Sequence, residues 1–126
     1  MPLVHHERCF GCGRTNLFGL LLEVEEVAPG AVAGRCFIKQ DHQGADGGRA
    51  HAGVLAAALA EAMSLACGLE ARAVSFEMWL TAPAPVGAFL EVEALVERRD
   101  GALAYAAATC TADQRMVAQA RGRFRS

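Results

Sequence analysis

The 126-residue sequence lacks any uncharged apolar run of the ~18 residues that a membrane-spanning helix needs. Its first residues also lack the basic region and the apolar region that make up a secretory signal. These absences argue against a membrane helix and against export. We therefore expect a cytoplasmic protein with no membrane partner.

The sequence also lacks a surplus of positive charge. Twelve Lys and Arg residues face 14 Asp and Glu residues, which gives a formal net charge of −2 and an isoelectric point near 6.1. The only local basic pattern is Arg121, Arg123 and Arg125, which we interpret as a solvated strand end. No nucleic-acid partner is expected.

A disulfide framework is not expected either, because the five cysteines are odd in number and no export signal precedes them. Cys9 and Cys12, with His5 and His6 nearby, resemble the ligands of a structural zinc site. A single Cys-x-x-Cys pattern without a second ligand pair is a weak indication of metal, and packing of the N-terminal segment is the preferred interpretation. We predict no metal and reduced thiols.

The 53% hydrophobic content and the length favour one domain over residues 1–126, in which residues 1–19 form a segment packed on the sheet. Hydrophobic periodicity predicts one long helix over Ala52 to Cys67, ending at Gly68. Period-two alternation and turn residues predict six strands around it: Leu20 to Val27, Ala31 to Ile38, Arg72 to Leu80, Phe89 to Arg98, Leu103 to Thr111 and Met116 to Phe124. The short connections favour an antiparallel α+β fold, with the sheet wrapped around the helix.

The helix carries a stripe of small residues that we expect to let a backbone approach closely, with larger apolar residues filling the remaining space. The small residues are Gly53, Ala56, Ala57, Ala60 and Ser64, and the larger ones are Leu55, Leu59, Met63 and Leu69.

The stretch from Gly48 to Met63 combines a glycine-containing turn, a helix start and one carboxylate. Unpaired N–H groups in the first turn of a helix attract an anion or a polarised carbonyl oxygen. Gly53 allows a substrate to approach that backbone closely. The stretch therefore predicts a site where negative charge develops.

Three blocks of the sequence form a pattern in a fixed order. The first is Cys9-Phe10-Gly11-Cys12-Gly13 through Asn16 to Leu20, the second runs from His42-Gln43-Gly44 to Met63, and the third is Leu80 to Gly87 with Pro83 and Pro85. In this order and spacing they resemble hotdog-fold acyl-CoA thioesterases of the PaaI-like, phenylacetate-pathway type, in which proline is usual at the place of Leu17. The resemblance covers nearly the whole chain.

The resemblance implies a hotdog fold, a homodimer or homotetramer, and hydrolysis of an acyl thioester at a dimer interface. Coenzyme A would enter as part of the substrate, and no separate cofactor is implied. In that chemistry a backbone N–H at the helix start, here from Gly53, holds the thioester oxygen, and a helix carboxylate acts as base or nucleophile. His51 would help to shape the turn.

The sequence departs from the family at the expected catalytic positions. The family's helix carboxylate falls on Ala60, with Glu61 one residue later, and its assisting threonine or serine falls on Ala73, with Ser75 two residues along the same strand face. Because the preceding loop is one residue longer, a register shift would return Glu61 to the catalytic place.

We therefore predict Glu61, Gly53 and His51 as catalytic residues. The predicted substrate contacts are Gln43, Asn16, Ala52, Ala60 and Ser75, and the reserve carboxylates are Asp46 and Glu77. Two alternatives stay open: a catalytically degenerate hotdog protein that binds acyl-CoA or a small hydrophobic ligand, and a hotdog enzyme of a biosynthetic pathway.

Overall fold

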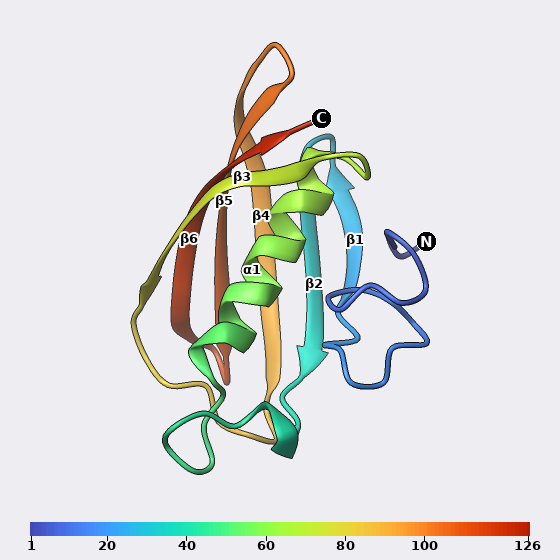
Figure 1. Ribbon diagram of the computed structural model, residues 1–126. Coiled ribbons are helices and arrows are strands. Elements are labelled where there is room, and N and C mark those ends of the chain that lie inside the picture. The colour runs from blue at the N-terminus through green and yellow to red at the C-terminus, as the bar shows by residue number, and fades with distance from the viewer.

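A six-stranded antiparallel sheet curves around one central helix in the computed structural model, which describes residues 1–126 (Figure 1). The strand order across the sheet is β1-β2-β4-β5-β6-β3. This confirms the predicted α+β architecture. The elements are β1 (Glu23–Ala28), β2 (Ala31–Phe37), the 3-10 helix η1 (Gln40–His42), α1 (Ala52–Cys67), β3 (Arg72–Leu80), β4 (Phe89–Asp100), β5 (Leu103–Ala112) and β6 (Arg115–Arg125).

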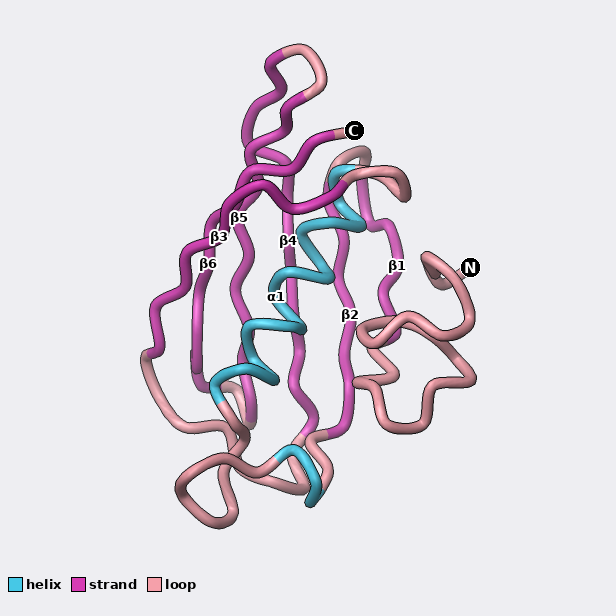
Figure 2. The backbone as a smooth tube through the Cα atoms, viewed as in Figure 1, coloured by secondary structure: helices cyan, strands magenta, loops and turns pink.

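Helix α1 lies along one face of the sheet (Figure 2). Its larger apolar side chains are buried there. Alternate residues of β5 are buried, so a single face of that strand points to the core. Leu59 and Met63 of α1 are fully buried in the same core as Leu90 of β4 and Phe124 of β6. Burial of such side chains is the main force that holds the helix on the sheet.

The predicted stripe of small residues lies on the other side of the helix. Ala58 and Ala62 are fully buried, whereas Ala57 and Ala60 are only half-buried and Gly53 is exposed. Leu69 was expected to fill apolar space, but it follows the helix end and is 48% exposed. The small side chains therefore leave a shallow surface on the outer face of α1, where a second molecule has access.

Strand β1 begins three residues later than predicted. Leu21 has a positive φ of 52°, which an L-residue rarely adopts in a strand. The backbone of Leu20 and Leu22 pairs instead with the carbonyls of Phe10 and Gly11, at 2.8 Å in both cases. These residues therefore belong to the N-terminal segment, not to the sheet.

The N-terminal segment, residues 1–22, lies beside β1 (Figure 1). Leu3 forms an antiparallel bridge with Val24, and its N–H donates to the Val24 carbonyl at 2.7 Å. Cys12, Leu20 and Leu22 are buried in the main core. The segment therefore covers the outer edge of β1 and is packed into the domain.

No helix of the structure combines the length and the apolar character that crossing a membrane requires. All five cysteines are free thiols.

Candidate functional site

The first hollow lies at the N-terminal end of α1 and has a volume of about 460 Å³. It is lined by His51, Ala52 and Leu55, by Asp46 and Arg49 of the preceding loop, and by residues 80–84. The predicted site at the helix start and Asp46, one of the two reserve carboxylates, therefore line the same hollow.

His51 caps the helix. Its Nδ1 accepts the N–H of Gly53 at 2.8 Å, and its carbonyl accepts the N–H groups of Val54 and Leu55. The predicted oxyanion donor, the Gly53 N–H, is therefore already bonded within the chain. Of the first-turn N–H groups, that of Ala52 has no partner, and Ala52 lines the hollow. The free donor lies one residue before the predicted one, because an N-cap side chain bonds the second or third N–H of a helix.

Gln43 stabilises the loop before the helix. Its Oε1 accepts the N–H of Gly48 at 2.6 Å, and its Nε2 donates to the Gln40 carbonyl at 2.8 Å. Both polar ends of the side chain are thus used inside the loop, and Gln43 does not line the hollow.

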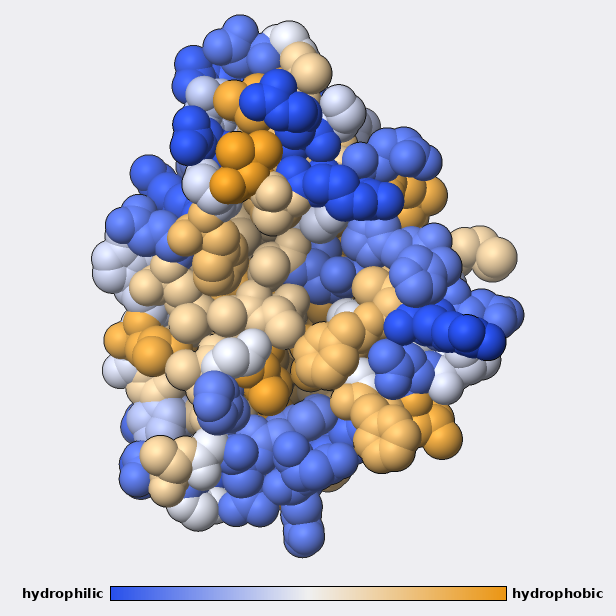
Figure 3. Space-filling model, viewed as in Figure 1, coloured by the Kyte–Doolittle hydropathy of each residue, from blue (hydrophilic) through white to orange (hydrophobic).

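A second hollow, of about 410 Å³, lies over the middle of α1. Ala60 and Ala73, the two positions at which the family resemblance expects catalytic side chains, both line it, and so does Glu61. Its other lining residues include Ala57, Ser64, Phe124 and, from the N-terminal segment, His5, His6, Cys9 and Phe10. In Figure 3 the apolar surface over α1 is bordered by hydrophilic residues.

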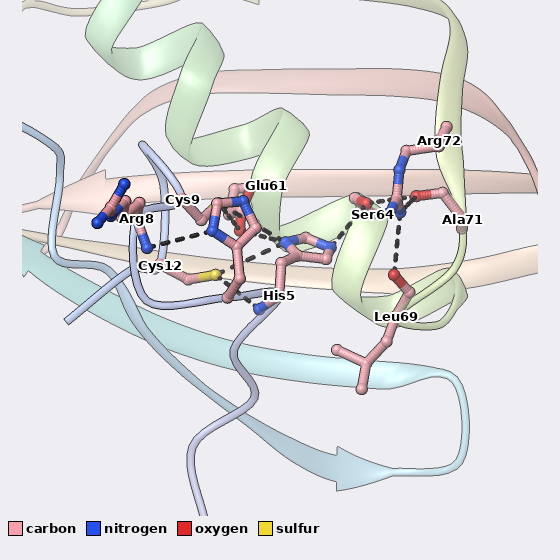
Figure 4. Close-up of polar contacts among 10 residues, drawn as sticks. His5, Arg8, Cys9, Cys12, Glu61, Ser64, Leu69, Ala71 and Arg72 are labelled. Atoms are coloured by element: carbon pink, nitrogen blue, oxygen red, sulfur yellow. Dashed lines mark hydrogen bonds and ion pairs between the residues drawn. The ribbon is translucent and has the colours of Figure 1, made fainter. Parts of the chain in front are cut away.

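Glu61 points from α1 toward the N-terminal segment (Figure 4). Its Oε2 lies 2.8 Å from Nδ1 of His5 and accepts the thiol of Cys9 at 3.3 Å. The Oε1 atom has no hydrogen-bond partner. The side chain is only 13% exposed, so one oxygen is held by the N-terminal segment and the other remains available to the hollow.

Ser64 lies one helical turn beyond Glu61. Its hydroxyl donates to the carbonyl of Ala71 at 3.0 Å, and its oxygen lies 3.4 Å from Nε2 of His5. The sequence assigned Ser64 only to packing and gave His5 no role in the site. Glu61 and Ser64 are spaced i, i+3, which puts both on one face of the helix, and this spacing could have indicated that they contact the same residue, His5.

Cys12 is buried below His5, whose backbone N–H donates to its Sγ at 3.2 Å. Burial raises the pKa of the Cys12 thiol well above its usual range, and the hydrogen bond with Glu61 and the Glu61 charge act in the same direction. The Cys12 thiol is therefore protonated when no cation lies among His5, Cys9, Cys12 and Glu61.

Asn16 and Ser75 lie apart from both hollows. Asn16 bonds the Arg8 carbonyl and the Phe18 N–H within the N-terminal segment. Ser75 was expected on the same strand face as Ala73, but the register shifts between these two residues, and a β-bulge interrupts the alternation of faces. Ser75 instead accepts a hydrogen bond from Arg123 at 2.8 Å, and it lines another depression with Glu77.

No family model and no curated protein matches the sequence. Solved structures do match. The Escherichia coli PaaI protein of the phenylacetic acid degradation operon is 18% identical, with a TM-score of 0.78 over 84% of this chain and 79% of that one. A mutant of the phenylacetic acid degradation protein PaaI from Thermus thermophilus is 27% identical, with a TM-score of 0.76 over 82% and 91%.

The chain has a hotdog fold. Mouse thioesterase superfamily member 2 shares it at 19% identity, with a TM-score of 0.74 over 82% of this chain and 80% of that one. The resemblance to PaaI-like thioesterases that the sequence motifs predicted is thus confirmed by the structure comparison.

The two hollows are too far apart to act on one carbonyl within a single chain. Gly53 and Glu61 are eight residues apart, which is about 12 Å along a helix that rises about 1.5 Å per residue. A base or nucleophile must reach its target within hydrogen-bond distance. Within one chain, therefore, the helix start and Glu61 cannot act on the same carbonyl.

Proposed function

We propose that the protein hydrolyses an acyl thioester, such as an acyl-CoA, at a site shared by two subunits. The observation that carries the proposal is the second hollow, where Glu61 lines the same surface as Ala60 and Ala73. A carboxylate is therefore present beside the place where the resemblance expects one, although it comes from the next residue of the helix.

In the proposed reaction, the free Ala52 N–H of one subunit holds the thioester oxygen, and Glu61 of the other subunit activates a water molecule. Oε1 of Glu61 takes a proton from the water, whose oxygen attacks the carbonyl carbon. The tetrahedral intermediate collapses as the carbon–sulfur bond breaks, and the leaving sulfur receives the proton. The products are a carboxylic acid and a thiol, so the reaction needs water and no further cofactor.

The N-terminus of α1 is suited to the oxyanion. The helix dipole and the unpaired Ala52 N–H both favour negative charge at this end. No acidic residue occupies the first turn of α1, and the hollow beside it is lined by one carboxylate, Asp46, and one cation, Arg49.

The subunit contact in the proposal is made by β3, an edge strand of the sheet. Its exposed apolar side chains are Val74, Phe76, Trp79 and Leu80, which are 37–58% exposed. A long apolar edge strand tends to pair with another chain. Pairing of β3 with its symmetry copy gives a homodimer, and a tetramer would form by further association. We place this assembly in the cytoplasm, where free thiols stay reduced.

A second candidate function, binding of an acyl thioester without hydrolysis, is favoured by one observation. Oε2 of Glu61 is held by His5 and Cys9, and the side chain at position 60 is a methyl group. If this engagement removes the basicity of Glu61, a carbonyl can bind beside α1 but no water is activated.

Assays with a panel of acyl-CoA substrates separate the two functions. If Glu61 is the base, Glu61→Gln lowers kcat at least ~10²-fold with little change in KM, because the lost group acts mainly in the transition state. Glu70→Gln, an exposed glutamate just after the helix, is the matched control and should keep the wild-type rate.

If the protein only binds thioesters, the wild type shows trace turnover, and Ala60→Asp raises it by placing a carboxylate in the second hollow. Robust wild-type hydrolysis that survives Glu61→Gln contradicts both versions. In that case Asp46 and Glu77 become the residues to test.

A further inference from the structure

We propose, contrary to the expectation of no metal from the sequence alone, that His5, Cys9, Cys12 and Glu61 form a zinc site that fastens the N-terminal segment to helix α1. The site shares Glu61 with the proposed hydrolysis: Oε2 would bind the ion, and Oε1 would stay free for the water molecule. One ligand atom from each residue lies within 4.8 Å of all the others.

Three of the six distances between the ligand atoms match those of a tetrahedral site. Bonds of about 2.0–2.3 Å place the ligand atoms of tetrahedral zinc about 3.3–3.8 Å apart. Nδ1 of His5 lies 3.7 Å from Sγ of Cys9 and 3.6 Å from Sγ of Cys12, and Sγ of Cys9 lies 3.3 Å from Oε2 of Glu61. The contact between His5 and Glu61, at 2.8 Å, is shorter and has the length of a hydrogen bond. An ion at the centre requires these two groups to separate by about half an ångström.

The donor set selects the metal. Two thiolates and an imidazole favour zinc over magnesium or calcium, which prefer ligand sets made of oxygen. Four protein ligands close the coordination shell, as in structural zinc sites, and leave no position for a bound water. The ion would hold the fold together rather than take part in catalysis.

The loop between the two cysteines is already shaped to present both sulfurs. The N–H of Gly13 donates to the Cys9 carbonyl at 2.9 Å, and the N–H of Cys9 donates to the His6 carbonyl at 3.2 Å. A Cβ at Gly13 would lie 2.4 Å from the Glu7 carbonyl, so this tight winding needs glycine there. The His5 N–H that points at Sγ of Cys12 would stabilise its thiolate.

Ser64 orients the imidazole for metal binding. Its one hydroxyl hydrogen is donated to the Ala71 carbonyl, so its oxygen can only accept from Nε2 of His5. With a proton on Nε2, the imidazole can give up the Nδ1 proton that it donates to Glu61 and bind the ion through the Nδ1 lone pair. Metal-bound histidines almost always donate their other N–H to such an outer partner.

Gly11 makes room for the fourth ligand. A Cβ at this position would lie 2.5 Å from two carbons of the Glu61 side chain. The carboxylate therefore reaches the cysteines only because residue 11 has no side chain. The absence of a side chain at Gly11 thus allows the Cys-x-x-Cys loop to contact Glu61, which lies 52 positions after Cys9 in the sequence.

Charge also favours a cation in the cluster. Two thiolates and a carboxylate would bring three negative charges together, and zinc offsets two of them. Metal-binding thiols release their protons when the ion enters, so the protonated Cys12 of the empty cluster is no obstacle.

Elemental analysis of protein purified from zinc-supplemented cells, without chelators, tests the proposal. We expect one zinc per chain, and we expect Cys9→Ser and Cys12→Ser each to weaken zinc binding at least ~10-fold. His6→Ala and Cys67→Ser are the matched controls, because they remove an exposed histidine and a buried thiol outside the cluster. Both should keep the metal.

Gly11→Ala adds a test that removes no ligand. The new methyl group displaces Glu61, so zinc affinity should fall, while the cobalt-substituted protein should retain its sulfur-to-metal charge-transfer absorption. Absence of zinc from wild-type protein to which zinc is added, or equal binding by both serine variants, overturns the proposal. Because these measurements use no substrate, a failure of the hydrolysis assay leaves them unchanged.

Discussion

At the scale of single residues, the site shows what sequence patterns can and cannot indicate. The resemblance directed attention to position 60, and Ala60, Glu61 and Ala73 line one hollow, although no catalytic role of these residues is tested by that. The cluster around Glu61 could not be predicted in the same way. His5, Cys9 and Cys12 have the weak spacing of one Cys-x-x-Cys pattern, and their fourth partner is separated from them by β1, β2 and the first part of α1.

His42 is a buried histidine with one unpaired nitrogen. Its Nδ1 accepts the N–H of Lys39 at 3.0 Å, whereas Nε2 has no partner. Burial lowers the pKa of His42, the Lys39 charge lowers it further, and Asp41 acts in the opposite direction. The folded protein therefore needs the neutral imidazole.

This predicts a loss of stability in acid. Above the unfolded-state pKa of about 6.5 both states are neutral at His42, and as the pH falls below it the unfolded chain binds a proton that the folded chain resists. His42→Asn keeps an acceptor for the Lys39 N–H and should flatten the decline of the unfolding free energy below about pH 6.5. Urea unfolding at several pH values measures this pH dependence. If the unfolding free energy of His42→Asn falls with pH as steeply as that of the wild type, His42 is not its cause.

At the scale of elements, local rules predicted the helix and most strands closely. The bounds of α1 and β3 match the expected ranges because a cap and turn residues flank them. The orientation of α1 was not predictable to the same degree. Alanine occurs all around the helix, so neither size nor hydropathy distinguishes the buried Ala58 and Ala62 from the half-buried Ala57 and Ala60.

His51 caps the N-terminus of α1, so its substitution should change the stability of the protein. His51→Ala removes the acceptor of the Gly53 N–H and should lower the unfolding free energy by about 1 kcal/mol, the usual scale for an N-cap. His51→Asp should restore most of that loss, since aspartate is a favoured N-cap residue. Urea unfolding at constant m-value provides the measurement, and equal stability of the alanine and aspartate variants would count against a capping role.

At the scale of the whole molecule, the two edges of the sheet differ. The exposed side chains of β1 include Glu23, Glu25 and Glu26, whereas β3 exposes mostly apolar side chains. Charged side chains discourage edge pairing, and apolar ones permit it. The order of the strands across the sheet, and hence the identity of the edges, follows from long-range pairing that the sequence pattern does not encode.

The open edge at β3 predicts an effect of charge on assembly. Phe76→Lys puts a charge in the middle of β3 and should shift the protein toward monomer in sedimentation velocity at micromolar concentration. Phe18→Lys changes an even more exposed phenylalanine in the N-terminal segment and should leave the sedimentation coefficient unchanged. A wild-type protein that sediments as a monomer would rule out the shared site.

The bridge between Leu3 and Val24 has a consequence for how far such association can proceed. A sheet with two free margins can add copies without limit and grow into a fibril. Here the N-terminal segment meets one margin at Val24, where the N–H of Leu3 satisfies a carbonyl of β1. A pair joined through β3 therefore has this obstacle, together with the charged side chains of β1, at both of its ends, which disfavours growth by strand addition beyond the second chain.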